Sequence, residues 1–141
     1  MTTRLIPAAE VGNLLVLMSS EPILHTELDA LPIFDREMLS ESSLGDEDFA
    51  RQLIEVFEST IGDYVRAYDA ALKASADQEA HRAMHSVKGS SRALGMMRLG
   101  QMSEILEKWV KLGCPGAAPI SVDEYREEVD RTIKVVRESL Q

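Results

Sequence analysis

The sequence predicts an all-α fold, an antiparallel up-down four-helix bundle with one or two short extra helices near its N-terminal end. Apolar residues recur at helical spacing along four segments between residues 46 and 140, and short connections separate these segments. The composition agrees, because aromatic residues make up only 5% of the chain and runs of β-branched residues are few. With 141 residues, the chain is long enough to bury one core of its own.

The first long helix is expected from Asp46 to Leu72. Acidic residues crowd its first turn, where carboxylates complement the positive end of the helix dipole. The apolar stripe that predicts its core face consists of Phe49, Leu53, Phe57, Ile61, Tyr64, Tyr68 and Leu72.

The second helix is expected to begin at Ser75, which forms a capping-box pattern with Gln78 three residues later. Gly95 is expected to end it, because glycine adopts the left-handed conformation common at helix ends without steric cost. The predicted core face of this helix consists of Ala80, Met84, Val87, Ser91 and Leu94.

Two more helices are expected to follow. The third ends before a stretch of helix breakers that runs from Gly113 to Pro119. Ser121 and Glu124 form another capping-box pattern at the start of the fourth helix. The third stripe consists of Leu99, Met102, Leu106 and Trp109, and the fourth of Tyr125, Val129, Ile133, Val136 and Leu140.

Residues 1–32 are interpreted as a partly helical N-terminal extension, and residues 33–141 as the bundle domain. Three prolines interrupt the extension at intervals too short for long helices. A short helix is expected from Val11 to Met18. Another is expected from Ile33 to Leu39, where it would lie across one end of the bundle and cover its core.

Charge and cysteine content limit the possible functions. The net charge of −9 repels nucleic acids and anionic membrane surfaces, and the most apolar stretch is far shorter than the roughly 20 residues of a spanning helix. The single cysteine, Cys114, cannot form an internal disulfide, and no secretory signal is recognisable. We therefore expect a cytoplasmic protein that binds neither nucleic acid nor membrane.

A group of reactive residues is expected beside the core face of the second helix. If that face is buried, then His81, His85, Lys88, Gly89 and Arg92 share the neighbouring, more exposed stripe. An uncharged imidazole can attack an electrophilic phosphorus near neutral pH, which makes His85 a candidate nucleophile. Lys88 lies close enough to neutralise phosphoryl charge, and Gly89 leaves room for an approaching protein at a cost of about 0.5–1 kcal/mol in helix stability.

The run HSVKGSSRALG, from His85 to Gly95, resembles the signature of histidine-containing phosphotransfer (Hpt) domains. The resemblance extends to the preceding GDEDFARQLIEVF and to the helix from Leu99 to Glu107, and it covers residues 33–140. It implies a phosphorelay intermediate of a two-component system, in which His85 accepts a phosphoryl group from an aspartyl phosphate on one receiver domain and transfers it to an aspartate on another.

The resemblance also implies partners and residue roles. The partners are receiver domains of hybrid sensor kinases and response regulators, which supply the catalysis and the divalent metal. This chain is then a monomeric carrier with no kinase activity and no cofactor of its own. Lys88 stabilises the phosphoryl group and Gly89 permits close contact. The expected receiver-docking surface consists of His81, Gly89, Ser90, Arg92 and Met96.

One position departs from the family pattern. Several members of the family place a glutamine that touches the histidine on the following helix, whereas this chain has Glu107 at the matching position. A carboxylate repels a phosphoryl group, so the role of the glutamine is not transferred to Glu107.

Two alternatives compete with phosphotransfer. His81 and His85 have the spacing of two metal ligands on one helix, but no third ligand is evident, and Lys88 and Arg92 would repel a cation. The other alternative is a helical interaction or dimerisation module without phosphoryl chemistry, which uses the stripe from Val11 to Met18 as its contact. In that case His85 is dispensable.

Overall fold

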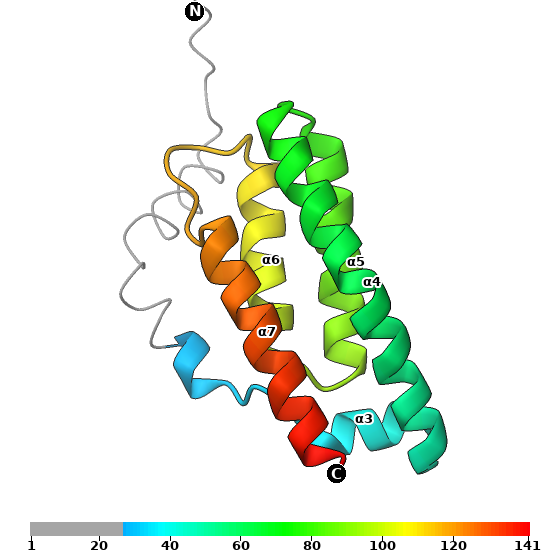
Figure 1. Ribbon diagram of the computed structural model, residues 1–141. Helices are drawn as coiled ribbons and strands as arrows, with labels where there is room; N and C mark the ends of the chain where they lie inside the picture. The colour runs from blue at the N-terminus through cyan, green and yellow to red at the C-terminus, as the bar shows by residue number, and fades with distance from the viewer. Residues whose placement is uncertain (1–26) are drawn as a thin grey trace, which may run out of the picture.

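The computed structural model describes residues 27–141, and every regular element in that range is helical. One helical turn covers residues 27–30, and α3 and four long helices follow. In Figure 1 the long helices lie side by side, and α3 crosses one end of them. The elements are α3 (Arg36–Ser42), α4 (Glu47–Lys73), α5 (Asp77–Ala93), α6 (Met97–Lys111) and α7 (Val122–Ser139). The predicted all-α class is confirmed for these residues, while the short helix predicted at residues 11–18 lies outside them.

Two of the predicted helix starts are correct. The side chain of Asp46 accepts a hydrogen bond from the backbone N–H of Phe49, and that of Ser121 accepts one from Glu124. These bonds satisfy backbone donors that a helix start leaves unpaired.

The capping box predicted at Ser75 is wrong. Ser75 adopts a left-handed conformation with φ 55°, and α5 begins after Ala76 without a side-chain cap. The N–H groups of Ser75 and Ala76 instead donate to the carbonyls of Leu72 and Ala71, so this connection closes the end of α4.

The turn between α5 and α6 holds α3 in place. Gly95 ends α5 with φ 84°, as predicted, and its carbonyl accepts a hydrogen bond of 2.7 Å from the N–H of Asp35. Asp35 is also the N-cap of α3, so this helix begins three residues later than predicted. Arg36 donates to the carbonyl of Ser139 at the end of α7. The segment therefore spans the bundle end, as the sequence predicted.

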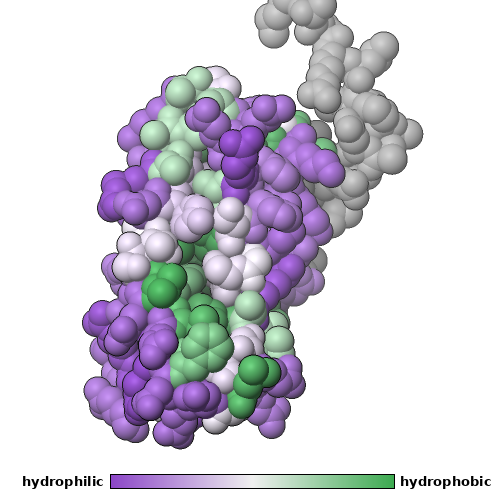
Figure 2. Space-filling model, turned by 90° about the vertical axis from the view of Figure 1, so that its right-hand side faces the viewer, coloured by the Kyte–Doolittle hydropathy of each residue, from purple (hydrophilic) through white to green (hydrophobic). Residues whose placement is uncertain are grey.

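The core lies between the long helices. All five residues predicted to form the core face of α5 are buried, and so are Leu99, Met102, Leu106 and Trp109 of α6. On α4, Phe49 and Tyr64 were predicted to be in the core but remain partly exposed, because Ile54, Phe57, Ile61, Val65 and Tyr68 form the buried face. Figure 2, which looks onto the side of α4 and α5, shows an apolar band among hydrophilic side chains.

Residues just before α3 also contact the bundle. Leu28 is buried in the core, and Arg98 of α6 donates hydrogen bonds to the carbonyls of Asp29 and Leu31. No helix of residues 27–141 is both long and apolar enough to cross a bilayer.

Candidate functional site

His85 lies on the outer surface of α5 and is accessible to another molecule. Its side chain is 64% exposed, while Met84 and Val87 on the opposite side of the helix are fully buried. Because Met84, Val87 and Ser91 fix the rotation of α5, the neighbouring stripe turns toward the edge of α6. The sequence predicted the exposure of His85 correctly.

Glu107 of α6 is the centre of the site. Its side chain is only 12% exposed, and three basic side chains from successive turns of α5 surround it. Its Oε1 lies 3.2 Å from Nδ1 of His85 and 3.3 Å from Nε2 of His81. Its Oε2 lies 2.8 Å from Nζ of Lys88. Among the described residues no aligned hydrogen-bond donor meets Oε2, so the Lys88 contact is that of an ion pair.

The environment of Glu107 favours its charged form. Burial raises the pKa of this carboxyl. The ion pair with Lys88 and the hydrogen bond with His85 together lower it by more, so the net pKa lies below the usual value. A charged carboxylate can only accept hydrogen bonds, so Nδ1 of His85 must donate its proton. In the neutral ring Nε2 then keeps its lone pair on the other edge, which is the form that a nucleophile requires.

Lys88 and Arg92, which the sequence places on the more exposed stripe of the second helix, are both paired. The Lys88 side chain is 20% exposed and lies against Glu107. Nη2 of Arg92 lies 3.1 Å from Oε2 of Glu104 and 3.2 Å from Oε1 of Gln101. The hydrogen bond from Arg92 lowers the pKa of the Glu104 carboxyl, although partial burial opposes it. Each of these α5 cations is therefore held by an α6 carboxylate.

Gly89 and Ser90 are exposed, one turn beyond His85. A Cβ added to Gly89 would meet nothing within 4 Å, so packing within the described chain does not require a glycine here. The Ser90 hydroxyl donates to the carbonyl of Ser86 on its own helix. Both residues leave the surface beside His85 open.

Met96 was predicted to belong to the docking surface, and this prediction is wrong. It is fully buried in the core, because its backbone forms the turn between α5 and α6 and its N–H donates to the carbonyl of Ser91. Its side chain therefore cannot touch a partner.

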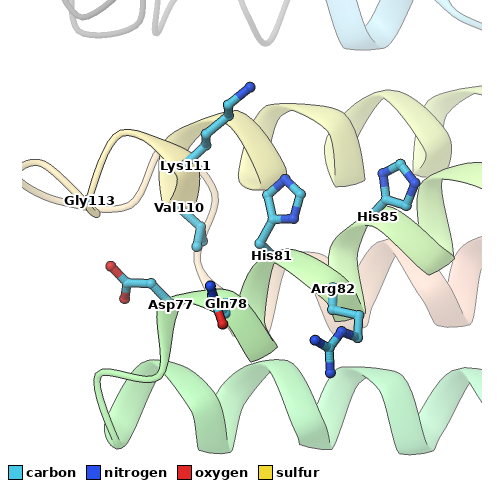
Figure 3. A pocket seen from close by; sticks show the side chains of 8 residues that line it. All are labelled: Asp77, Gln78, His81, Arg82, His85, Val110, Lys111 and Gly113. Atoms are coloured by element: carbon cyan, nitrogen blue, oxygen red, sulfur yellow. The ribbon is translucent and has the colours of Figure 1, made fainter.

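A groove extends from His85 toward the start of α5. Its volume is about 630 Å³, and the ring of His81 stacks on that of His85 within it, with centroids 6.0 Å apart and planes 12° from parallel. We call it the His81 groove, and Figure 3 shows the residues that line it: Asp77, Gln78, His81, Arg82, His85, Val110, Lys111 and Gly113.

Residues 27–141 contain no group of three or more His, Cys, Asp or Glu side chains arranged to hold a metal ion. His81 and His85, the pair with metal-ligand spacing, instead face the same oxygen of Glu107.

Comparison with protein families identifies the bundle. A family model described as Hpt domain matches residues 52–135, a range that runs from α4 to α7 and includes every residue around Glu107. The chain belongs to the Hpt domain family. Searches of curated proteins and of solved structures found no match.

Sequence reasoning did not foresee how this Hpt domain holds its basic stripe. Gln101, Glu104 and Glu107 are polar residues three positions apart on α6, opposite the basic residues of α5. That spacing was a usable signal, because residues three apart share one face of a helix.

Replacing Glu107 by Gln should destabilise the Hpt domain by about 1–2 kcal/mol near neutral pH, because Lys88 loses its counter-charge. The folded-state pKa of Glu107 is lowered, so its stabilisation is present above the ordinary carboxyl pKa and is lost as pH falls through the folded value. Urea unfolding at stepwise lower pH should therefore show the wild type and the variant converging below the ordinary carboxyl pKa.

The matched control is Glu138→Gln, which removes an exposed carboxylate from α7. Its free energy of unfolding should stay close to that of the wild type at every pH. If the difference in free energy of unfolding between the wild type and Glu107→Gln stays constant down to pH values where the carboxyl is protonated, the ion-pair interpretation is wrong.

Proposed function

We propose that this Hpt domain is a phosphorelay intermediate that carries a phosphoryl group on Nε2 of His85. It accepts the group from an aspartyl phosphate on one receiver domain and passes it to an aspartate on another, with no kinase activity of its own. The observation that carries the proposal is the imidazole of His85, which is exposed while Glu107 holds its Nδ1–H. Membership of the Hpt domain family supports the same chemistry.

The transfer step balances with the groups around His85. The lone pair of Nε2 attacks phosphorus, and the N–P bond forms as the bond from phosphorus to the aspartyl oxygen breaks. The departing aspartate takes the bonding electron pair. Because Nδ1 keeps its proton, the ring becomes positively charged, and the Glu107 carboxylate 3.2 Å away stabilises that charge. The reverse sequence delivers the group to the next receiver.

The position of Glu107 also answers the objection that it repels a phosphoryl group. It lies at the Nδ1 edge of the ring, whereas the phosphoryl group is carried at Nε2. Lys88 lies one turn from His85 and shields the carboxylate further, and its ammonium is the group that we assign to stabilise the phosphoryl oxygens.

The proposal has further parts that rest on the resemblance and the composition. The partners are receiver domains of hybrid sensor kinases and response regulators, and the protein works as a cytoplasmic monomer without a cofactor. Residues 33–141 form the functional unit, with α4 to α7 as an antiparallel up-down bundle. The alternating directions of the long helices in Figure 1 support this arrangement. His81, Gly89, Ser90 and Arg92 lie around the docking surface.

The direct test is phosphotransfer from receiver domains of the source organism. Each receiver is phosphorylated with acetyl phosphate and Mg²⁺, freed of acetyl phosphate, and mixed with the full chain in the presence of Mg²⁺. We expect at least one receiver to label the chain with a phosphoryl group that is labile in acid and stable in base, as a phosphoramidate is. If no receiver labels the chain, or if the label is stable in acid, the proposed function is wrong.

Gly89→Ala should separate stability from function. Alanine in mid-helix should stabilise the free protein by about 0.5–1 kcal/mol, because nothing in the described chain opposes the added methyl group. The same methyl group stands where a receiver approaches His85, so transfer should slow. Urea unfolding and the rate of transfer from the fastest receiver measure the two effects.

Gly62→Ala is the control, since Gly62 is also in mid-helix, on α4, where an added Cβ meets only the flexible end of Arg66. It should leave transfer unchanged. Wild-type transfer by Gly89→Ala would refute the steric role of Gly89.

A further inference from the structure

The unpaired basic residues of this acidic protein are unevenly distributed. Most described arginines and lysines hold a carboxylate or a backbone carbonyl, as Arg92 holds Glu104 and Arg137 holds Glu58. Within residues 27–141, the basic side chains for which the structure records no ion pair or hydrogen bond are Arg82, Lys108, Lys111 and Lys134. All of these except Lys134 lie on α5 and α6, the helices that carry His85 and Glu107.

Arg82 and Lys111 line the His81 groove. Figure 3 shows them at opposite edges, with Arg82 projecting from α5, Lys111 from α6, and His81 between them. Asp77 is the carboxylate that lines the groove, and it lies at the far end, where Sγ of Cys114 is 3.9 Å from its Oδ1. The edges of the groove that flank His81 are therefore positive, while the chain as a whole has a net charge of −9.

We propose that the His81 groove binds a carboxylate-bearing segment of the receiver domain, and that Arg82 and Lys111 are specificity-determining residues. This inference rests on the proposed function, because the receiver brought to His85 is the molecule that lies over the groove. Most of the protein surface repels an acidic partner, so a local positive region both attracts it and fixes its orientation. Arg82 and Lys111 give up no recorded ion pair when they bind.

The groove suits a protein segment better than a small anion. A small anion is held by donors that converge on one point, as in bidentate recognition by arginine. Arg82 and Lys111 project from opposite edges, with His81 between them. A segment that spans the groove can reach both cations.

The test compares charge reversals that change the net charge by the same amount. Arg82→Glu and Lys111→Glu alter the groove, and Lys134→Glu alters the surface of α7. Rapid-quench transfer is measured from the phosphorylated receiver that labels wild-type His85 fastest. At about 50 mM salt, the second-order rate constant should fall by about tenfold for each groove variant and by less than about twofold for Lys134→Glu. The difference in rate constant between the groove variants and Lys134→Glu should become smaller at higher salt, where charges are screened.

The maximal rate at saturating receiver should remain within about twofold of wild type in both groove variants, because neither residue touches the reacting atoms. A loss of maximal rate with unchanged dependence on receiver concentration would overturn the specificity role. Equal slowing by all three variants, or slowing by none, would also overturn the specificity role. In either case, labelling of the wild type would still support the phosphorelay function.

A second measurement does not depend on transfer. Amide spectra of the ¹⁵N-labelled chain with the same unphosphorylated receiver should change most at residues 77–82 and 110–113. Changes confined to the exposed face of α4 around Phe49 and Tyr64 would overturn the proposal. So would inorganic phosphate alone, if it shifted the same groove amides and displaced the receiver, because the groove would then be a small-anion site.

Discussion

Replacing His85 by Gln should abolish phosphoryl labelling by every receiver domain while the protein stays folded. Glutamine has no nucleophilic ring nitrogen, and the other imidazole of the site, that of His81, directs its Nε2 toward Glu107. The side chain is 64% exposed, so the free energy of unfolding should change by less than about 1 kcal/mol. Receiver labelling measures the first effect, and circular dichroism with urea unfolding measures the second.

His81→Gln is the matched control, because His81 stacks on His85 and faces the same Glu107 oxygen. It should retain a phosphoryl group with the same lability in acid. Normal labelling of His85→Gln, or loss of labelling in His81→Gln alone, would show that the acceptor has been assigned to the wrong imidazole.

Replacing Gly95 by Ala should cost more stability than replacing Gly62, Gly89 or Gly116 by Ala. A Cβ at this position would lie 2.1 Å from the backbone oxygen of Asp35, and φ is 84°, a conformation that alanine rarely adopts. The turn must move, which breaks the hydrogen bond from Asp35 to the Gly95 carbonyl and loosens α3 from the bundle end. We expect a loss of at least about 3 kcal/mol in urea unfolding.

Gly116→Ala separates the two causes of this loss. Gly116 has φ 64°, but a Cβ there would meet nothing within 4 Å. Only the cost of the left-handed conformation applies, which is about 1–2 kcal/mol. Equal losses for the two variants would mean that the contact between Gly95 and Asp35 contributes nothing.

The sequence was most informative where a structural preference is local. The core face of α5 follows from helical spacing alone, and once that face is known, the exposure of His85 follows as well. Ser121 was recognisable as a cap because it bonds an N–H three residues away, whereas Asp46, placed by the sequence in the first turn, is itself the cap of α4. The prediction at Ser75 was wrong because a serine at this position can either cap the next helix or close the preceding one. Only three residues connect α4 and α5, and Ser75 is used to close α4.

Features that depend on how two helices meet were not predictable. Periodicity does not fix the register of α6 against α5, so it does not reveal that Lys88 reaches Glu107 or that Arg92 reaches Glu104. Met96 illustrates the same limit, because whether a turn residue points outward or into the core depends on the tertiary path of the chain. Arg82 and Lys111 stand out as groove cations without a recorded partner only once the partners of the other basic side chains are known.

The hydrogen bond from Arg36 to the carbonyl of Ser139 joins residues near opposite ends of the described chain. A domain whose first and last elements lie close together can be inserted into a surface loop of a host protein without distorting the fold of the host. We therefore expect the part of the bundle from α3 to α7 to tolerate circular permutation, with a short linker across the junction and new termini in the exposed connection around Gly116, at the opposite end of α7. This one contact thus brings the start of α3 beside the end of α7, which is the geometry that such rearrangements require.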